Sequence, residues 1–222
     1  YYTMPNHNTA DELTIVEARI LAVLVEKEKT TPDVYPLTLN SLSAGCNQKS
    51  ARDPVLSLSD SEIQSALENL RSRVLVIESY GASGRVLRYA QNFGKVYGLP
   101  AASVSLLSTL MLRGPQTVSE LRANCERLYR FDDASSVEAY LNEMAQRPAG
   151  GLCQKLPKQA GSREHRWMHL LCGNTSFNTT AYSSGMQQES LSLNELAEKV
   201  HRLEDEMAEL KQRLDDLTAN RL

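Results

Sequence analysis

Hydrogen-bond donors are concentrated in one short stretch of the first half of the chain, Asn47-Gln48-Lys49-Ser50-Ala51-Arg52. Amide and cationic side chains suit contacts to phosphate oxygens and to the edges of bases. We therefore predict that Asn47, Gln48, Lys49 and Arg52 contact DNA. The alternative interpretation is a solvated loop in which Asn47 caps the end of a helix.

Two segments predicted to form β-hairpins carry further candidate contacts. Basic hairpins can follow a phosphate backbone or enter a minor groove. Two of the candidate arginines precede aromatic residues, Tyr89 and Trp167, so the alternative is that their aliphatic stems pack against these rings. The hairpin candidates are Arg85, Arg88, Lys158, Arg163 and Arg166.

Few residues have the types and spacing of a metal or catalytic site. Cys153, His165, His169 and Cys172 combine two ligand types, and the two histidines have an H-x3-H spacing. They lie around predicted hairpin strands, however, and the closely spaced cysteine pairs of a zinc finger are missing, so we predict no metal site. The chain also lacks a Gly-rich phosphate loop, an H-E-x-x-H motif and a G-x-S-x-G motif. We expect a binding protein without a cofactor, not an enzyme.

The sequence contains an internal repeat. Residues 38–46 (TLNSLSAGC) align with residues 117–125 (TVSELRANC), and residues 84–89 (GRVLRY) align with residues 162–167 (SREHRW). A period this long indicates duplicated domains rather than stacked structural repeats. In each copy, apolar residues at helical spacing predict three helices, which are followed by a predicted hairpin. That order of elements is typical of a winged helix-turn-helix.

The predicted fold is therefore mainly α, of the α+β class, with two tandem winged helix-turn-helix domains, residues 11–98 and 99–172. The predicted helices span about residues 13–29, 38–46 and 60–74 in the first copy and 102–113, 118–129 and 135–146 in the second. The predicted strands span residues 55–58, 75–80, 86–91, 152–156 and 166–171.

A flexible linker and a coiled-coil helix are predicted after the second copy. Residues 173–190 (GNTSFNTTAYSSGMQQES) have the Ser-, Thr-, Asn- and Gly-rich composition of a linker. Residues 191–222 follow with an unbroken heptad pattern of apolar residues, which predicts a coiled coil that makes the chain a homodimer. The predicted dimerisation residues are Leu193, Leu196, Val200, Leu203, Met207, Leu210, Leu214 and Leu217.

The net charge of −3 does not by itself favour binding to a polyanion. Most of the negative excess lies in the tail after residue 172, so a nucleic-acid role would depend on local patches. No apolar stretch is long enough to span a membrane. The first residues also lack the features of a secretory signal, so we expect a cytoplasmic protein.

Several segments resemble the YceH-like family of bacterial proteins. They include residues 30–37 (TTPDVYPL), residues 46–55 (CNQKSARDPV), Glu17-Ala18-Arg19 and Met168-His169-Leu170. The resemblance extends over nearly the whole chain. It implies a tandem winged-helix protein without an established biochemical role, so no catalytic residues come with it.

The predicted third helices of the two copies are acidic on their outward faces, with Glu62 and Glu68 in the first and Glu138 and Glu143 in the second. In a major groove these carboxylates would approach phosphates. The leading hypothesis is nevertheless a DNA-binding protein, a transcriptional regulator that uses the polar loop and the two hairpins. The alternative is a tandem winged-helix scaffold that binds other proteins and no DNA.

Overall fold

The computed structural model describes residues 12–80, 84, 86–158 and 161–173. The chain divides into two compact units, residues 1–176 and 177–222. The predicted coiled coil, its eight dimerisation residues and all of the predicted linker except Gly173 lie outside the described residues, as does the hairpin candidate Arg85. Each of these therefore stays a prediction.

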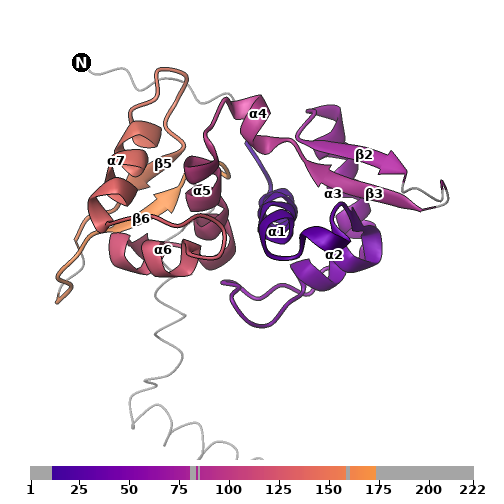
Figure 1. Ribbon diagram of the computed structural model, residues 1–222, viewed down its shortest axis with the longest axis horizontal. Coiled ribbons are helices and arrows are strands. Elements are labelled where there is room, and N and C mark those ends of the chain that lie inside the picture. The colour runs from indigo at the N-terminus through magenta and orange to yellow at the C-terminus, as the bar shows by residue number, and fades with distance from the viewer. Residues whose placement is uncertain (1–11, 81–83, 85, 159–160, 174–222) are drawn as a thin grey trace, which may run out of the picture. The chain divides into compact units, whose positions relative to one another are not determined.

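The first half of the described chain forms three α-helices and a small sheet (Figure 1). Each helix begins where a hydroxyl side chain accepts a backbone N–H: Thr14 caps α1, Thr38 caps α2 and Ser59 caps α3. The elements are α1 (Ile15–Thr30), the 3₁₀ turn η1 (Pro32–Val34), β1 (Leu37–Thr38), α2 (Leu39–Cys46), α3 (Asp60–Ser72), β2 (Val76–Tyr80) and β3 (Leu87–Gln91).

The second half has the same order of elements after a short connecting helix, α4 (Phe93–Tyr97). Thr117 caps its second helix and Asp133 its third. The elements are α5 (Ala101–Arg113), β4 (Gln116–Thr117), α6 (Val118–Cys125), α7 (Ala134–Ala145), β5 (Cys153–Lys155) and β6 (Arg166–His169).

Strand pairing is the same in the two halves. Each contains a three-stranded antiparallel sheet, with the order β1-β3-β2 in the first and β4-β6-β5 in the second. Thr38 is opposite Arg88, and Thr117 is opposite Arg166, so the residue that caps the second helix also fixes the register of the sheet. Three helices followed by a hairpin, with a short strand before the second helix, make this an α+β protein with a winged-helix-like arrangement.

Several predicted boundaries need correction. The apolar run Val55–Leu58 is not a strand, because no described strand pairs with it and the backbone of Leu58 is bonded by the side chain of Asn47. The predicted helix 118–129 ends at Cys125, and the predicted hairpin strands of the second half are shorter than expected. The short elements η1, β1, β4 and α4 were not predicted.

The two halves meet where α1 packs along α5 (Figure 1). Residues 17–25 of α1 and 102–112 of α5 are buried without interruption, as in helices enclosed on all sides. Small residues allow close packing, and the buried hydroxyls of Ser105, Ser108 and Thr109 donate to carbonyls one turn earlier in α5.

Backbone bonds also join the halves. The N–H of Leu13, before α1, donates to the carbonyl of Leu171 at 2.7 Å, and the N–H of Asp53 donates to the carbonyl of Leu112 at 2.7 Å. The buried apolar residues form one continuous cluster. The predicted boundary at residues 98/99 therefore does not separate two compact units, and the division into two domains stays a prediction. No described helix has the length and apolar character that crossing a membrane requires.

Because the core is continuous, we expect both halves to unfold together. Ile63 of α3 is fully buried in the first half, whereas Trp167, the only tryptophan, is buried in the second. An Ile63→Ala substitution should lower stability by about 2–5 kcal/mol. Urea denaturation followed by Trp167 fluorescence should report the same loss as circular dichroism of the whole chain. A Trp167 transition that does not move would show that the halves unfold independently.

Candidate functional site

The polar loop between α2 and α3 has a fixed conformation although it contains no regular secondary structure. Asn47, the C-cap of α2, bonds both backbone groups of Leu58: its amide donates to the carbonyl at 2.8 Å and accepts the N–H at 2.7 Å. The two ends of the loop are thereby joined. The structure thus uses Asn47 as a structural residue, in agreement with the alternative interpretation that it caps the helix.

Arg52 does not face solvent, which corrects its assignment as a DNA contact. The side chain is fully buried, and Nη2 lies 2.6 Å from a carboxylate oxygen of Glu26 in α1. The guanidinium also donates to the carbonyl of Gly45 at 3.2 and 3.3 Å and to that of Ala51 at 2.9 Å. Its donors are directed into the protein, so none is left for a phosphate or a base.

A second buried guanidinium, which sequence reasoning missed, supports the same loop. Arg19 of α1 donates to the carbonyl of Cys46 at 3.2 Å and to that of Pro54 at 2.6 Å. Burial, and then the nearby charge of Arg52, lower the pKa of Arg19. A charged residue in the middle of an apolar helix was the signal in the sequence that could have identified this contact.

Little of the positive charge of the loop is available to a ligand. Lys49 is exposed and is the one cation of residues 47–58 that reaches solvent, since Arg52 is buried. The amide of Gln48 is half-buried and donates to the carbonyl of Ser50 at 3.1 Å. A single lysine gives little attraction for a polyanion.

The hairpin arginines that recur in both halves have a shared structural role. Nη1 of Arg88 donates to the carbonyl of Pro36 at 2.7 Å, and Nη1 of Arg166 donates to the carbonyl of Pro115 at 2.7 Å. Arg166 also bonds both carboxylate oxygens of Glu120 at 3.0 Å. Arg88 and Arg166 therefore tie β3 and β6 to the turns before β1 and β4. Both are half-buried, and their assignment as DNA contacts stays a prediction.

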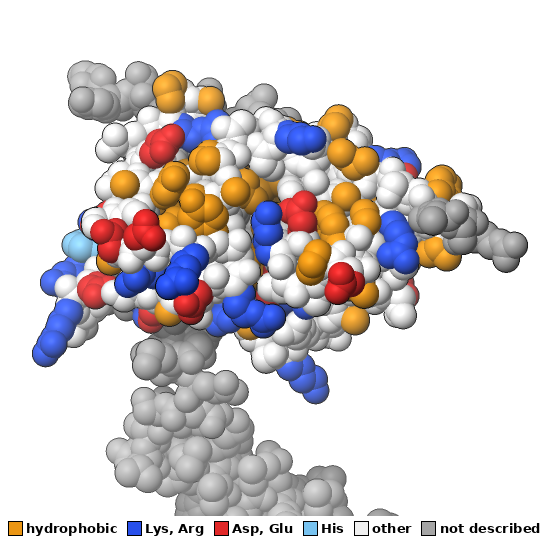
Figure 2. All heavy atoms as spheres, in the orientation of Figure 1, with side chains coloured by type: hydrophobic (Ala, Val, Ile, Leu, Met, Phe, Trp, Pro, Cys, Tyr) orange, Lys and Arg blue, Asp and Glu red, His pale blue; other side chains and the backbone are white. Residues whose placement is uncertain are grey.

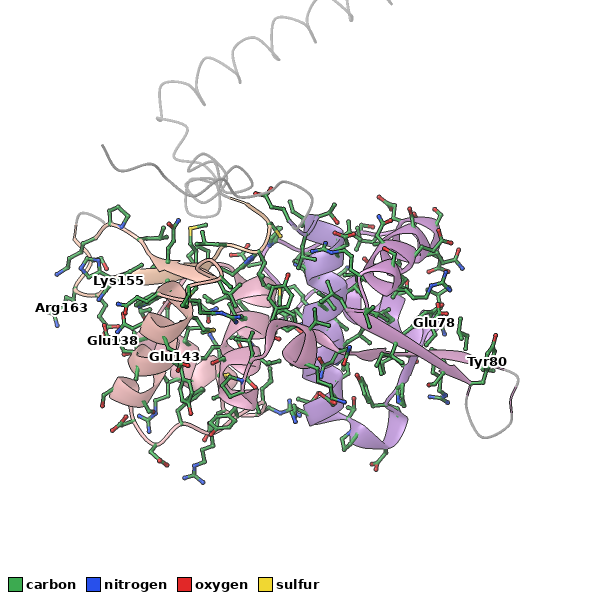
Figure 3. The ribbon with its side chains drawn as sticks, turned by 90° about the horizontal axis from the view of Figure 1, so that it is seen from above. Glu78, Tyr80, Glu138, Glu143, Lys155 and Arg163 are labelled. Atoms are coloured by element: carbon green, nitrogen blue, oxygen red, sulfur yellow. The ribbon has the colours of Figure 1, made fainter. Side chains whose placement is uncertain are left out.

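Exposed cations remain on the second hairpin. Lys158 and Arg163 are exposed, and Figure 3 shows Arg163 directed away from the sheet. Lys155 of β5 forms an ion pair with Glu138 of α7 at 3.0 Å and lies 5.7 Å from the centre of the Trp167 ring. Of the nine candidate DNA contacts, the described ones that remain exposed are Lys49, Lys158 and Arg163.

The charged side chains that the third helices expose are mainly carboxylates. Glu68 of α3 and Glu143 of α7 are exposed, and α7 contains no lysine or arginine. Arg71, the one cation of α3, pairs with Glu78 of β2 at 3.0 Å. Figure 2 shows acidic and basic side chains interspersed on the face that it draws, without a broad basic patch.

The cysteines and the buried histidine offer no reactive centre. Burial raises the pKa of the Cys46, Cys153 and Cys172 thiols to about 12 and that of Cys125 to about 11, so all four remain protonated near neutrality. Burial lowers the pKa of His169 to about 4. Within the described residues, no group of three or more His, Cys, Asp or Glu side chains could hold a metal ion.

An open pocket of about 280 Å³ lies at the corner between α6 and α7. Arg122 and Arg130 line it together with Glu126, and Arg122 is occupied in holding the corner, because it donates to the carbonyls of Phe131 and Asp132. The mixture of charges gives the pocket no clear preference for a ligand of one sign.

The described residues thus define a winged-helix-like α+β protein with acidic third helices. Residues 13–162 match the family model described as "Protein of unknown function, DUF480", and the chain belongs to this family. The UPF0502 protein of Leptothrix cholodnii is 57% identical over 162 residues, which cover 73% of this chain and 72% of the relative. That of an Acidovorax species is 50% identical over 212 residues, covering 94% and 93%. That of Cupriavidus metallidurans is 50% identical over 210 residues, covering 89% and 85%. The predicted resemblance to an uncharacterised bacterial family is confirmed.

Two substitutions in the polar loop should differ strongly in their effect on stability. Arg52→Ala leaves Glu26 and the Gly45 carbonyl without their donor, so we expect a loss of about 3 kcal/mol. Lys49→Ala, the matched control, removes an exposed charge and should change stability by less than about 0.5 kcal/mol. Urea denaturation measures both. Equal, small effects would show that Arg52 is not a structural residue.

The depressed pKa of His169 should make stability depend on pH. The unfolded chain binds a proton below the ordinary pKa of about 6.5, whereas the folded chain resists it until about pH 4. Stability is therefore fully present above pH 6.5 and falls as the pH drops towards 4, by on the order of 2–3 kcal/mol. His169→Gln should flatten this part of the stability curve, and His165→Gln, at an exposed position, should not. An unchanged slope in His169→Gln would contradict the assignment.

Proposed function

We propose that this protein binds another protein, and that the exposed faces of α3 and α7 contact a basic surface of the partner. The observation that carries the proposal is the excess of exposed carboxylates on both third helices. The exposed carboxylates are Asp60, Glu62 and Glu68 on α3 and Glu143 on α7, whereas Glu138 of α7 is already paired with Lys155.

Electrostatics disfavour the usual docking of such helices on duplex DNA. A third helix placed in a major groove lies between two rows of phosphates. Two like charges 4 Å apart repel by about 1 kcal/mol in water and by about 4 kcal/mol at the effective dielectric near a protein surface. Four exposed carboxylates would meet this repulsion, since Glu138 is paired with Lys155. The exposed cations of the candidate set that could offset it are Lys49, Lys158 and Arg163, and two of these lie on a hairpin rather than on a helix.

The same carboxylates are well placed to bind lysine and arginine side chains. Hydrogen bonds between ionised groups are roughly twice as strong as neutral ones, and complementary charge increases the rate of encounter. Part of the acidic surface is also fixed in place: Glu62 accepts from the backbone N–H and the hydroxyl of Ser59, and these hydrogen bonds lower its pKa below the usual range.

We also propose the domain arrangement and the dimer that were predicted from the sequence. The two halves would act as paired winged-helix modules, and the heptad pattern of residues 191–222 would join two chains through a coiled coil. A homodimer would present four acidic helices, and linked contacts of this kind raise the overall affinity without any new type of contact. We propose a cytoplasmic scaffold of this type that is not an enzyme.

DNA binding remains the second candidate because of one observation. Lys158 and Arg163 of the second hairpin are exposed and form none of the ion pairs described above. A hairpin with these cations could follow a phosphate backbone without placing α7 in a groove. Such binding would be weak, strongly salt-dependent and independent of base sequence.

Affinity measurements on matched variants test the proposal. Partners co-purified with the full chain from its host should lose at least about tenfold in affinity for the double variant Glu68→Gln, Glu143→Gln, because these carboxylates make charge-assisted bonds. The control, Lys158→Ala with Arg163→Ala, should bind the partner normally. Random-sequence duplex at low salt should not shift the wild-type chain at micromolar concentration.

The opposite pattern would favour the second candidate. Salt-sensitive duplex binding that loses about 2 units of salt slope in the Lys158→Ala, Arg163→Ala variant would assign the function to the second hairpin. Partner binding that is insensitive to the two carboxylate substitutions would contradict the proposed interface.

A further inference from the structure

The outer strands of the two sheets occupy equivalent positions but have different free edges. β2 is one edge strand of the first sheet, opposite β1, and β5 is the equivalent edge strand of the second, opposite β4. The registers align them residue by residue, because Glu78 is opposite Tyr89 in the first half and Lys155 is opposite Trp167 in the second. The internal repeat therefore provides a direct comparison between two edges of one fold.

The second edge has features that prevent another strand from pairing with it. β5 is only three residues long and ends in Lys155. Leu156, Pro157 and Lys158 follow. Short length, lysine and proline are the usual means by which proteins protect an exposed edge.

The first edge lacks this protection. β2 is five residues long (VIESY) and contains neither lysine nor proline. Two of its large apolar side chains are exposed, Ile77 at 45% and Tyr80 at 70%, and Val86, just before β3, is exposed as well. Figure 3 shows Tyr80 at the outer end of the strand, further from α3 than Glu78. An unprotected apolar edge of this length is a typical site for the addition of a strand.

The backbone groups of this edge can be assigned from the hydrogen bonds of the sheet. The carbonyl of Leu75 accepts from the N–H of Asn92 at 2.8 Å, so Leu75 faces β3. Alternate residues of an antiparallel pair face inward, so Ile77 and Ser79 also face β3. Val76, Glu78 and Tyr80 therefore direct their N–H and C=O groups away from β3, where no described strand pairs with them. Val76 is buried, so the accessible part of this edge is at Glu78 and Tyr80.

We propose that an extended segment of the partner protein binds to the free edge of β2 as a fourth strand. This inference rests on the proposed protein-binding function and specifies where and what that protein binds. Side chains alternate across a strand, so the segment would place apolar residues beside Ile77 on one face and beside Tyr80 on the other. A basic residue would lie beside Glu78, on the face towards α3.

The charge of Glu78 favours a partner strand with a basic residue over a second copy of the same chain. The antiparallel register that pairs all five residues of β2 with a second β2 places Glu78 opposite Glu78, and like charges directly opposite are destabilising. Glu78 and Glu68 both act on the single guanidinium of Arg71, so these three side chains together carry a net negative charge. A lysine or arginine in the incoming strand would neutralise it.

A peptide selection on the full chain tests the edge directly. Random peptides displayed on phage are selected on the wild-type chain, and the affinities of the recovered peptides are measured for three variants. Tyr80→Pro removes an edge N–H and copies Pro157 of the second half. Tyr80→Ala removes the ring but keeps the N–H, and Ser79→Ala changes a residue whose backbone faces β3. We expect alternating apolar and basic peptides that lose at least about tenfold in affinity with Tyr80→Pro, less with Tyr80→Ala and less than about twofold with Ser79→Ala.

The outcomes separate this inference from the proposed function. Peptides that bind Tyr80→Pro as tightly as wild type, or a selection that yields no edge-dependent peptide, would overturn the inference. If the natural partner loses affinity with the Glu68→Gln, Glu143→Gln variant but not with Tyr80→Pro, only the edge is overturned. A fall in molar mass of Tyr80→Pro by light scattering would show that the edge pairs two copies, which also overturns it. If Tyr80→Pro is less stable than wild type by thermal denaturation, Ile77→Lys replaces it, with the same expected loss of affinity.

Discussion

The packing of α1 against α5 is the constraint on which the rest of the structure depends. Both helices are buried over most of their length, so each half uses its first helix to complete a core shared with the other half. The bond between Leu13 and Leu171 adds a backbone link between the beginning of one half and the end of the other. Among the described residues, the third helices, the hairpins and the polar loop all have exposed side chains that can contact a partner.

Around this core, arginine side chains mainly stabilise irregular backbone. An unsatisfied buried carbonyl costs about 1–3 kcal/mol, and one guanidinium has five N–H donors with which to satisfy several carbonyls. Each half has an arginine at an equivalent position that donates to a backbone carbonyl. Nη1 of Arg73 donates to the carbonyl of Glu12, before α1, and Nη2 of Arg147 donates to the carbonyl of Tyr97, before α5. The arginine pairs Arg73/Arg147 and Arg88/Arg166 are therefore part of the fold. Lys49, Lys158 and Arg163 are exposed and do not have this role.

The helices and hairpins could be predicted because their periodicities depend on residues close together in the chain. The repeat predicted that both halves would contain the same elements, but it could not show whether they would share a core. The contacts of Arg52 could not be predicted, because its partners are Glu26 in another element and backbone carbonyls that have no sequence signature. Likewise, Val55–Leu58 has the composition of a strand, yet no strand lies beside it, and Asn47 and Arg19 fix the loop instead. The acidic character of the third helices was evident from the sequence, whereas the burial of Arg52, a predicted DNA contact, was not.

The central claim is that the third helices meet a protein surface and not a duplex. Nuclear magnetic resonance of the isotope-labelled full chain, titrated with random-sequence duplex at low salt, tests it most directly because it reports on each residue. We expect that the chemical shifts of the amide signals of α3, α7 and residues 47–52 do not change. Shifts concentrated on these segments that disappear as salt is added would contradict it.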